Sequence, residues 1–489
     1  MKIIKNISKI AFILAFSVIG FLVFTFFPTR LDFSKNSAYT LSPATKKTIR
    51  SIGKPLTIQV FLSSDLPTKL LPLKTDVLEL LQEYRKTGKN ISVTVLDPKN
   101  DIQAATKVKD YNIPQMQFSQ LEQNKYQVST AYFGIVLTYE GKTEIIPQVA
   151  DYSNLEYNLT AAIFRMTRME LPAIAIVGEQ AGLAQTNSDP ILLLKQALAQ
   201  QYSITSVQLK TIKEEDKNNF IKKYSSIIVL DPESQKYDSD EIALLKSYFE
   251  SGGKLVVLSG GVTVDEQTLG ASLSNNNINE LTATYGATIK NNLVLSTSAE
   301  YVNFGNAQSQ FLVAYPFWIR TNTFDEKSGL FANVQYFSFP WVSEVAIAQK
   351  SGIKISPLIF SSQRAWTQGE PFVLNPDIIP QPKATDLKAR LLAALVENKK
   401  GGKMIVVGSS RFAYEKYLGQ RSGNLDFVLN AIDTFSSNGS LVGIRSRSLS
   451  TYPVSDLSDT QKNIYKYAAI LLFPLLWGVY GGIHLLKRK

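Results

Sequence analysis

Two long apolar segments, one near each end of the chain, constrain the fold of this 489-residue sequence more than any other feature. Residues 10–27 carry no charge, and 18 residues of helix at about 1.5 Å each reach roughly 27 Å, close to the thickness of a bilayer's hydrocarbon layer. Residues 464–486 form a second apolar segment, in which Lys466 is the one charged residue. We expect a transmembrane helix in each. A cleaved signal peptide is the alternative for the first, but no small-residue cleavage site precedes Arg30.

The second apolar segment contains a proline and three glycines. Pro474 is expected to kink the helix. Gly478, Gly481 and Gly482 remove side-chain bulk, which would let another membrane helix approach closely. Simple tolerance of glycine in membrane helices explains the pattern equally well. The single histidine, His484, is interpreted as a polar residue at the membrane interface.

Positive charge is concentrated at the two ends of the chain. Of the net charge of +11, eight charges fall within residues 1–30 and 464–489, which leaves +3 for the 433 residues between them. Such a nearly neutral interior argues against nucleic-acid binding, which needs dense neutralisation of phosphates. Lysines precede the first segment and follow the second, so the tails at 1–9 and 487–489 are expected in the cytoplasm. The bulk of the chain would then lie on the periplasmic side of an inner membrane.

The region that follows the first apolar segment, residues 31–152, alternates between strand-like and helix-like patterns. The expected elements are a strand, an amphipathic helix ending at glycine, a second strand and a hairpin, at 56–62, 73–88, 91–98 and 132–149. These elements predict a small α/β module. A linker helix is expected at 153–170.

The region from 171 to 440 repeats one pattern, in which an apolar strand runs into a turn and a helix follows. The expected strands lie at 173–180, 225–232, 254–261 and 401–412. Because they alternate with helices, they predict a doubly wound parallel sheet, so the fold class is α/β. Between 262 and 394 the periodicity is weak, which indicates an insertion or cap with an extra strand at 335–339. Residues 441–463 are expected to be a linker.

The chemistry of several enzyme classes is missing from the region between the apolar segments. The chain has no cysteine, and its one histidine lies in the second apolar segment, so thiolate chemistry, histidine-based zinc sites and a Ser-His-acid relay are excluded there. Gly141-Lys142-Thr143 ends like a phosphate-binding loop, but Val136 stands where that loop needs glycine. We therefore expect no enzyme activity, no cofactor and no metal. A hydrolase that uses two carboxylates remains an alternative.

Three short stretches at expected strand ends are candidate ligand or partner contacts. Open α/β sheets bind ligands beyond the carboxyl ends of their strands. The candidates are Gly178, Glu179, Gln180, Ser259, Gly260, Gly261, Ser409, Ser410 and Arg411. The alternative is that the serines among them are ordinary turn residues.

Several motifs, in order along nearly the whole chain, resemble the GldG-type family. They are LDFSKNSAYTLSPATKKTI at 31–49, NLTAAIFRMTR before AIAIVGEQ, YFESGGKLVVL, IVVGSSRF, and IRSRSL before the second apolar segment. The turn at Gly178-Glu179-Gln180 departs from the family, which has more glycine and a histidine there. Members of this family are extracytoplasmic auxiliary subunits of ABC transport systems that are linked to gliding motility in some bacteria.

The resemblance implies a protein without its own ATPase, associated with an ABC permease and a cytoplasmic nucleotide-binding subunit. It also implies a flavodoxin-like or amidotransferase-related central fold, although the nucleophilic cysteine of amidotransferases is absent here. We expect a non-catalytic auxiliary subunit whose outer domains bind a substrate, an envelope component or a partner protein. A scaffold or sensor that needs no transporter is the main alternative.

Overall fold

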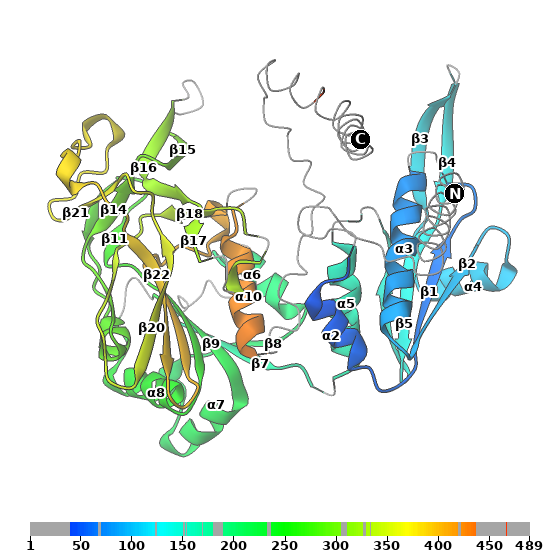
Figure 1. The fold of residues 1–489 in the computed structure, drawn as a ribbon, viewed down its shortest axis with the longest axis horizontal. Coiled ribbons are helices and arrows are strands. Elements are labelled where there is room, and N and C mark those ends of the chain that lie inside the picture. The colour runs from blue at the N-terminus through cyan, green and yellow to red at the C-terminus, as the bar shows by residue number, and fades with distance from the viewer. Residues whose placement is uncertain are drawn as a thin grey trace, which may run out of the picture. The chain divides into compact units, whose positions relative to one another are not determined.

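A computed structural model describes residues 40–436 and residue 466, apart from short stretches at 67–69, 123–124, 150–151, 153, 169, 179–188, 232–235, 305–310, 326–328, 333 and 419–421 (Figure 1).

Both predicted membrane segments fall outside the described residues, except for Lys466. The candidate packing residues Pro474, Gly478, Gly481 and Gly482 lie outside them as well. None of the helices that the structure does describe has both the length and the apolar character needed to cross a bilayer.

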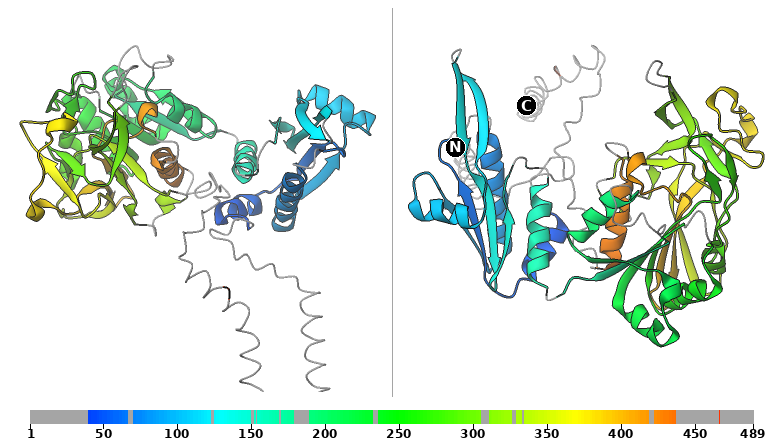
Figure 2. Two further views of the ribbon diagram at one scale, coloured as in Figure 1. Left: turned by 90° about the horizontal axis from the view of Figure 1, so that it is seen from above. Right: turned by 180° about the vertical axis from the view of Figure 1, so that it is seen from behind.

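The N-terminal module is built from a mixed four-stranded sheet with helices beside it. Its elements are α2 (Pro43–Arg50), β1 (Leu56–Leu62), α3 (Leu71–Thr87), β2 (Ile91–Leu96), α4 (Ile102–Asp110), β3 (Met116–Glu122), β4 (Lys125–Ala131), β5 (Phe133–Tyr139), β6 (Lys142–Ile146) and α5 (Leu155–Met166). The strand order is β2-β1-β5-β6, with β1 and β2 parallel and the other pairs antiparallel. The predicted strands, helix and hairpin are confirmed. Helix α4 and the separate β3–β4 ribbon are additions that the sequence patterns did not predict (Figure 2).

Helix α5 occupies the predicted linker position, but it is part of the module's core. Its residues Leu159, Ala162 and Ile163 are almost fully buried and pack in one cluster with β1, β5 and α3. A helix that buries this much apolar surface contributes stability, at about 1.5–3 kcal/mol for each large side chain. The segment therefore acts as a structural helix of the module.

A buried polar network joins α2, α3 and α5. The side chain of Glu156 accepts hydrogen bonds from the backbone N–H of Ser42, at 2.8 Å, and from the hydroxyl of Thr45, at 2.6 Å. Tyr84 donates to the backbone carbonyl of Glu156 at 3.0 Å, and its hydroxyl lies 2.6 Å from that of Thr160. Burial, together with the charge of Glu156, raises the pKa of Tyr84 well above its usual value, so it stays a donor at neutral pH. Each group left unpaired here would cost about 1–3 kcal/mol, so the network fixes α2 in place.

The larger domain contains a set of alternating strands and helices. They are β7 (Ala173–Val177), α6 (Leu192–Ala199), β8 (Ser203–Ser206), η2 (Leu209–Thr211), η3 (Glu214–Asp216), α7 (Lys217–Lys223), β9 (Tyr224–Leu230), α8 (Ser239–Glu250), β10 (Lys254–Leu258), β23 (Lys403–Val407), η8 (Glu415–Tyr417) and α10 (Asn424–Ser436). Strands β8, β7, β9, β10 and β23 are adjacent in that order and parallel. Numbered along the chain, this is the order 2-1-3-4-5 of flavodoxin-like sheets.

Alternate residues of the parallel strands face two separate cores. Ile176, Ile228 and Val256 face one core together with α6 and α10, which is orange in Figure 1. Val177 and Val257 face the other core, which contains side chains of α7, α8 and α9 (Asn279–Thr282). Strands that are buried on both faces are expected to be continuously apolar, and β7, β9, β10 and β23 were predicted from this pattern. The edge strand β8, which is mostly exposed, was not predicted.

The segment between β10 and β23 contributes part of the main sheet and a cap, which we define as those elements of the segment that lie outside the main sheet. Its elements are β11 (Val262–Val264), β12 (Ala271–Leu273), α9, η4 (Ala283–Tyr285), β13 (Ala287–Ile289), β14 (Leu293–Ser296), β15 (Ala299–Asn303), β16 (Leu312–Thr321), β17 (Thr323–Phe324), η5 (Gly329–Phe331), β18 (Phe337–Pro340), β19 (Val345–Ile347), β20 (Ile353–Phe360), β21 (Ala365–Gln368), η6 (Pro376–Ile378), η7 (Ala384–Asp386) and β22 (Leu391–Asn398).

Strands β17, β20 and β22 extend the main sheet beyond β23 in antiparallel fashion, giving an eight-stranded mixed sheet. The prediction of an all-parallel sheet is therefore wrong for this part. The prediction of a separate insertion is also incomplete, because β22 pairs directly with β23. The expected strand at 335–339 is confirmed as β18, shifted by two residues at its start.

Candidate functional site

The carboxyl ends of the parallel strands form the predicted ligand-binding region, which we call the carboxyl edge. Strands β7, β9, β10 and β23 lead there into Gly178, Asp231, Ser259-Gly260-Gly261 and Gly408-Ser409-Ser410-Arg411. Of the predicted contacts, Glu179 and Gln180 lie outside the described residues.

The structure brings two of the three predicted groups together. Strands β10 and β23 are neighbours, so Gly260 and Ser410 lie side by side, and a Cβ placed on Gly260 would be 3.8 Å from the backbone N of Ser410. Gly178 lies farther along the edge, because β9 separates its strand from β10.

Asp231, which was not among the predicted residues, organises the middle of the carboxyl edge. Its carboxylate accepts hydrogen bonds from the hydroxyl of Ser259, at 3.0 Å, and from the side-chain amide of Asn276, at 2.6 Å. The amide of Asn276 also donates to the carbonyl of Gly260, at 2.9 Å. Asp231 and Ser259 are both buried. A buried carboxylate needs such donors, and here one of them comes from the segment that follows β12.

The segment between β10 and β23 also approaches the carboxyl edge through its backbone. The N–H of Gly261 donates to the hydroxyl of Ser343 at 2.9 Å, and the N–H of Ser343 donates to the carbonyl of Gly408 at 2.7 Å. A Cβ on Gly261 would lie 2.1 Å from the carbonyl oxygen of Lys290, and one on Gly408 would lie 2.2 Å from that of Ser343. These glycines are needed because another backbone occupies the space where a side chain would stand.

A tyrosine packs against the strand ends where the strand order reverses, between β7 and β9, and the loops that follow these two strands, at 179–188 and 232–235, lie outside the described residues. The hydroxyl of Tyr237 donates to the carbonyl of Leu230 at 2.6 Å, and a Cβ on Gly178 would lie 2.1 Å from that hydroxyl oxygen. Burial, with the charges of Asp231 and Glu241, raises the pKa of Tyr237 well above its usual value, so it remains a neutral donor. In flavodoxin-like sheets this crevice receives the ligand, whereas here Tyr237 packs into it.

Arg411, a predicted contact, instead holds part of the cap. Its guanidinium donates to Glu266 at 2.9 Å and to the carbonyl of Val264 at 2.6 Å, and it lies 5.2 Å from the centre of the Trp341 ring. Tyr417 also hydrogen-bonds Glu266. Burial alone would raise the pKa of Glu266, but the hydrogen bonds and nearby cations outweigh it and lower the pKa. Arg411 therefore links the end of β23 to β11.

Trp341 has a strained backbone conformation near the carboxyl edge. Its φ is +42°, a left-handed conformation that costs a bulky side chain about 1–3 kcal/mol. Its ring packs edge to face against Trp318, at 5.4 Å between centroids, and against Tyr417, at 5.6 Å. Its backbone N–H donates to the carbonyl of Phe317 at 2.9 Å. These contacts hold the residue where the cap meets the sheet.

Three exposed apolar side chains lie near the end of the β15–β16 hairpin. Tyr301, Phe311 and Leu312 expose 70%, 61% and 68% of their surface. The sequence analysis did not single them out, although two apolar runs around the polar stretch 305–310 are a hairpin signal.

The hydroxyls of Ser259 and Ser409, at the carboxyl edge, have structural roles. Ser259 donates to Asp231, and Ser409 donates to the carbonyl of Pro340 at 2.9 Å. Both serines are almost completely buried. The arrangement can hold the cap on the sheet, but it does not present these hydroxyls to a substrate.

The close packing at Gly178 makes a specific prediction. Gly178→Ala would combine the strain of a φ of +82° with a contact of 2.2 Å to the backbone carbonyl of Leu230, which cannot rotate away. We expect the free energy of unfolding of this domain to fall by about 2–5 kcal/mol. Urea denaturation of the full chain in detergent, followed by tryptophan fluorescence, measures it.

The matched control is Gly352→Ala in the same domain. Gly352 has a φ of +78°, but the nearest atom to its Cβ would be the mobile Lys399 side chain at 3.7 Å. This variant should lose only about 1–2 kcal/mol, from backbone strain. Equal losses in the two variants would show that the space beside Gly178 is open.

Comparisons with known proteins identify relatives of both domains. Residues 171–431 match the family model described as an ABC-type uncharacterized transport system, and residues 35–138 match a domain of unknown function. An uncharacterized protein of Borreliella burgdorferi is 22% identical over 485 residues, which cover 94% of this chain and 93% of that protein.

Two solved structures are also similar to parts of this chain. The mmIFT52 N-terminal domain is 18% identical, with a TM-score of 0.37, and the match covers 54% of this chain and 97% of that one. A β-galactosidase from Rahnella sp. R3 is 12% identical, with a TM-score of 0.27, over 83% of this chain and 48% of that one. At these TM-scores neither likeness bears on the fold or the function.

The family match, in contrast, is sufficient to assign a family, because it extends over more than half of the sequence and includes every parallel strand of the larger domain. The chain therefore belongs to this family of ABC-type transport system auxiliary components.

Proposed function

We propose that this protein is a non-catalytic, membrane-anchored auxiliary subunit of an ABC-type transporter, of the GldG type. Helices at 10–27 and 464–486 anchor it in the inner membrane, both tails lie in the cytoplasm, and the two α/β domains lie in the periplasm. The observation that carries the proposal is the family match over residues 171–431.

The carboxyl edge supports a role in binding proteins rather than in chemistry. Tyr237 packs at the crevice where a flavodoxin-like sheet takes a ligand, and Asn276 and Ser343 bond to the ends of β9 and β10. A domain closed in this way is suited to present a fixed surface to partners. The energy for transport would come from a cytoplasmic nucleotide-binding subunit, coupled through an ABC permease.

The alternative of a two-carboxylate hydrolase gains no support from Glu156 and Asp231, two of the buried acids among the described residues. Glu156 accepts from Ser42 and Thr45, and Asp231 accepts from Ser259 and Asn276. These hydrogen bonds join segments of the chain. They give the two carboxylates structural roles, whereas a hydrolase needs an acid pair facing a substrate.

The proposed topology predicts which parts of the chain are accessible. Protease added to spheroplasts, outside the inner membrane, should digest the region from Thr29 to Asn463 while epitope tags on both tails stay protected, because basic tails oppose translocation. Protection of the central region against protease would contradict the proposed topology.

The proposed partnership predicts that the full-length protein co-purifies with an ABC permease from its native membrane in mild detergent. In lipid, apolar surface alone gives little drive for helix pairing, so specificity must come from close packing. Changing Gly478 and Gly482 to leucine should therefore reduce recovery of the permease several-fold and leave membrane insertion intact. Quantitative mass spectrometry of the purified complex measures the recovery.

The control for this experiment changes Leu472 and Leu476 to isoleucine, which keeps the side-chain volume and should alter recovery little. If the glycine variant keeps the permease at the wild-type level, the second helix is only an anchor. If no permease is recovered with the wild-type protein, the scaffold alternative is favoured.

A further inference from the structure

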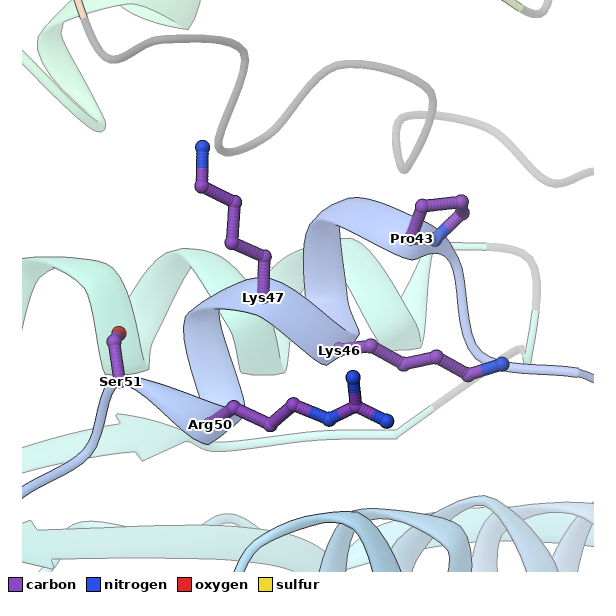
Figure 3. A pocket seen from close by; sticks show the side chains of 5 residues that line it. All are labelled: Pro43, Lys46, Lys47, Arg50 and Ser51. Carbon is purple, nitrogen blue, oxygen red and sulfur yellow. The ribbon is translucent and has the colours of Figure 1, made fainter.

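The first described helix, α2, carries a basic groove on its outer side. The groove has a volume of about 560 Å³ and is lined by Pro43, Lys46, Lys47, Arg50 and Ser51, which belong to α2 or follow it directly (Figure 3). Three of these five residues are cations and none is an acid. The helix itself, PATKKTIR, contains no acidic residue.

The arrangement of Lys46 and Arg50 is unfavourable without an anion. The side chains of Lys46 and Arg50, one helical turn apart, extend along the same side of α2, as Figure 3 shows. Like charges at this spacing repel each other. The helix dipole favours cations in the last turn, where Lys47 and Arg50 lie, but Lys46 precedes that turn. Across the described residues, neither Lys46 nor Arg50 has a carboxylate within ion-pairing distance.

The opposite side of α2 fixes the groove in position. Thr45, Thr48 and Ile49 are buried, and Ser42 caps the helix by accepting a hydrogen bond from the N–H of Thr45 at 2.9 Å. Glu156 binds the same turn from α5. The cations therefore project from a rigid support, which lowers the entropic cost of binding a ligand.

We propose that this groove binds the phosphate headgroups of anionic phospholipids at the membrane surface. The proposal rests on the anchoring proposed above: residues 28–42 join the first apolar segment to α2, and such a linker reaches at most about 50 Å when fully extended. Lysine and arginine form strong, charge-assisted hydrogen bonds with phosphate oxygens. Within this reach, α2 can approach the membrane surface, where anionic headgroups attract cations that come within about a Debye length.

Lysine footprinting of the full-length protein in nanodiscs tests this inference. One set of nanodiscs contains phosphatidylcholine alone, and the other contains phosphatidylcholine with phosphatidylglycerol. We expect acetylation of Lys46, measured by mass spectrometry, to slow about fivefold or more in the second set. The attraction of a lysine or arginine to an anionic surface raises the ratio of its bound to its free population by about this factor, and a lysine bound to a headgroup is shielded from the reagent. Raising the salt concentration to about 1 M should remove the effect, since the Debye length then falls to about 3 Å.

The matched internal controls are Lys107 and Lys109, in the last turn of α4 in the same module, whose acetylation should not depend on the lipid. Arg50→Gln should remove most of the protection of Lys46, whereas Lys109→Gln should leave it unchanged. Equal acetylation of Lys46 in the two lipid mixtures, in protein shown by co-elution to be inserted, would overturn the inference and leave the anchoring intact.

Two further outcomes also count against the inference. If inorganic phosphate added to phosphatidylcholine nanodiscs protects Lys46 as well as phosphatidylglycerol does, the groove binds free anions and the membrane assignment is wrong. A chain that stays outside the nanodiscs would contradict the proposed anchoring, and with it the placement of α2 near a membrane.

Discussion

The closure of the carboxyl edge by the chain's own cap is the constraint on which the larger domain depends. Parallel strands end in a row of backbone groups and turns that either bind a ligand or must be covered. Here Asn276 and Ser343 cover the ends of β9 and β10 with hydrogen bonds, and Tyr237 donates to the carbonyl at the end of β9, beside the reversal point. The close approach requires glycine at Gly261 and Gly408. In other flavodoxin-like proteins this edge of the sheet binds a small molecule. In this protein the same edge packs against the cap.

The sequence patterns located four of the five parallel strands because their burial has a simple signature, but they missed the edge strand β8, which is mostly exposed. Residues of β10 and β23 face two cores, so each strand is apolar after its first residue, a lysine, and each follows a pair of glycines. Strand β22 could not be found in this way. Its sequence, LLAALVEN, consists largely of good helix formers, yet pairing with β20 and β23 places it in the sheet. Tertiary pairing overrode local preference there.

The candidate site could be predicted only in part, for a related reason. Gly178, Ser259 and Ser409 follow apolar runs, so their position at strand ends was readable from the sequence. The residues that close the edge come from loops without periodicity, such as Asn276 and Ser343, and their partners are distant in sequence. No local pattern records a contact across more than forty residues, as between Asn276 and Asp231.

The central claim is that the cap and the sheet form one closed unit, and hydrogen exchange of the full-length protein tests it most directly. The N–H of Gly261 and that of Ser343 are hydrogen-bonded between cap and sheet, so the account predicts that peptides covering 259–262 and 341–345 exchange as slowly as β10 and β23. Peptides covering 380–388, where most residues are exposed, provide the fast reference. If 259–262 and 341–345 exchange as fast as that reference, the carboxyl edge is open in solution and the account is contradicted.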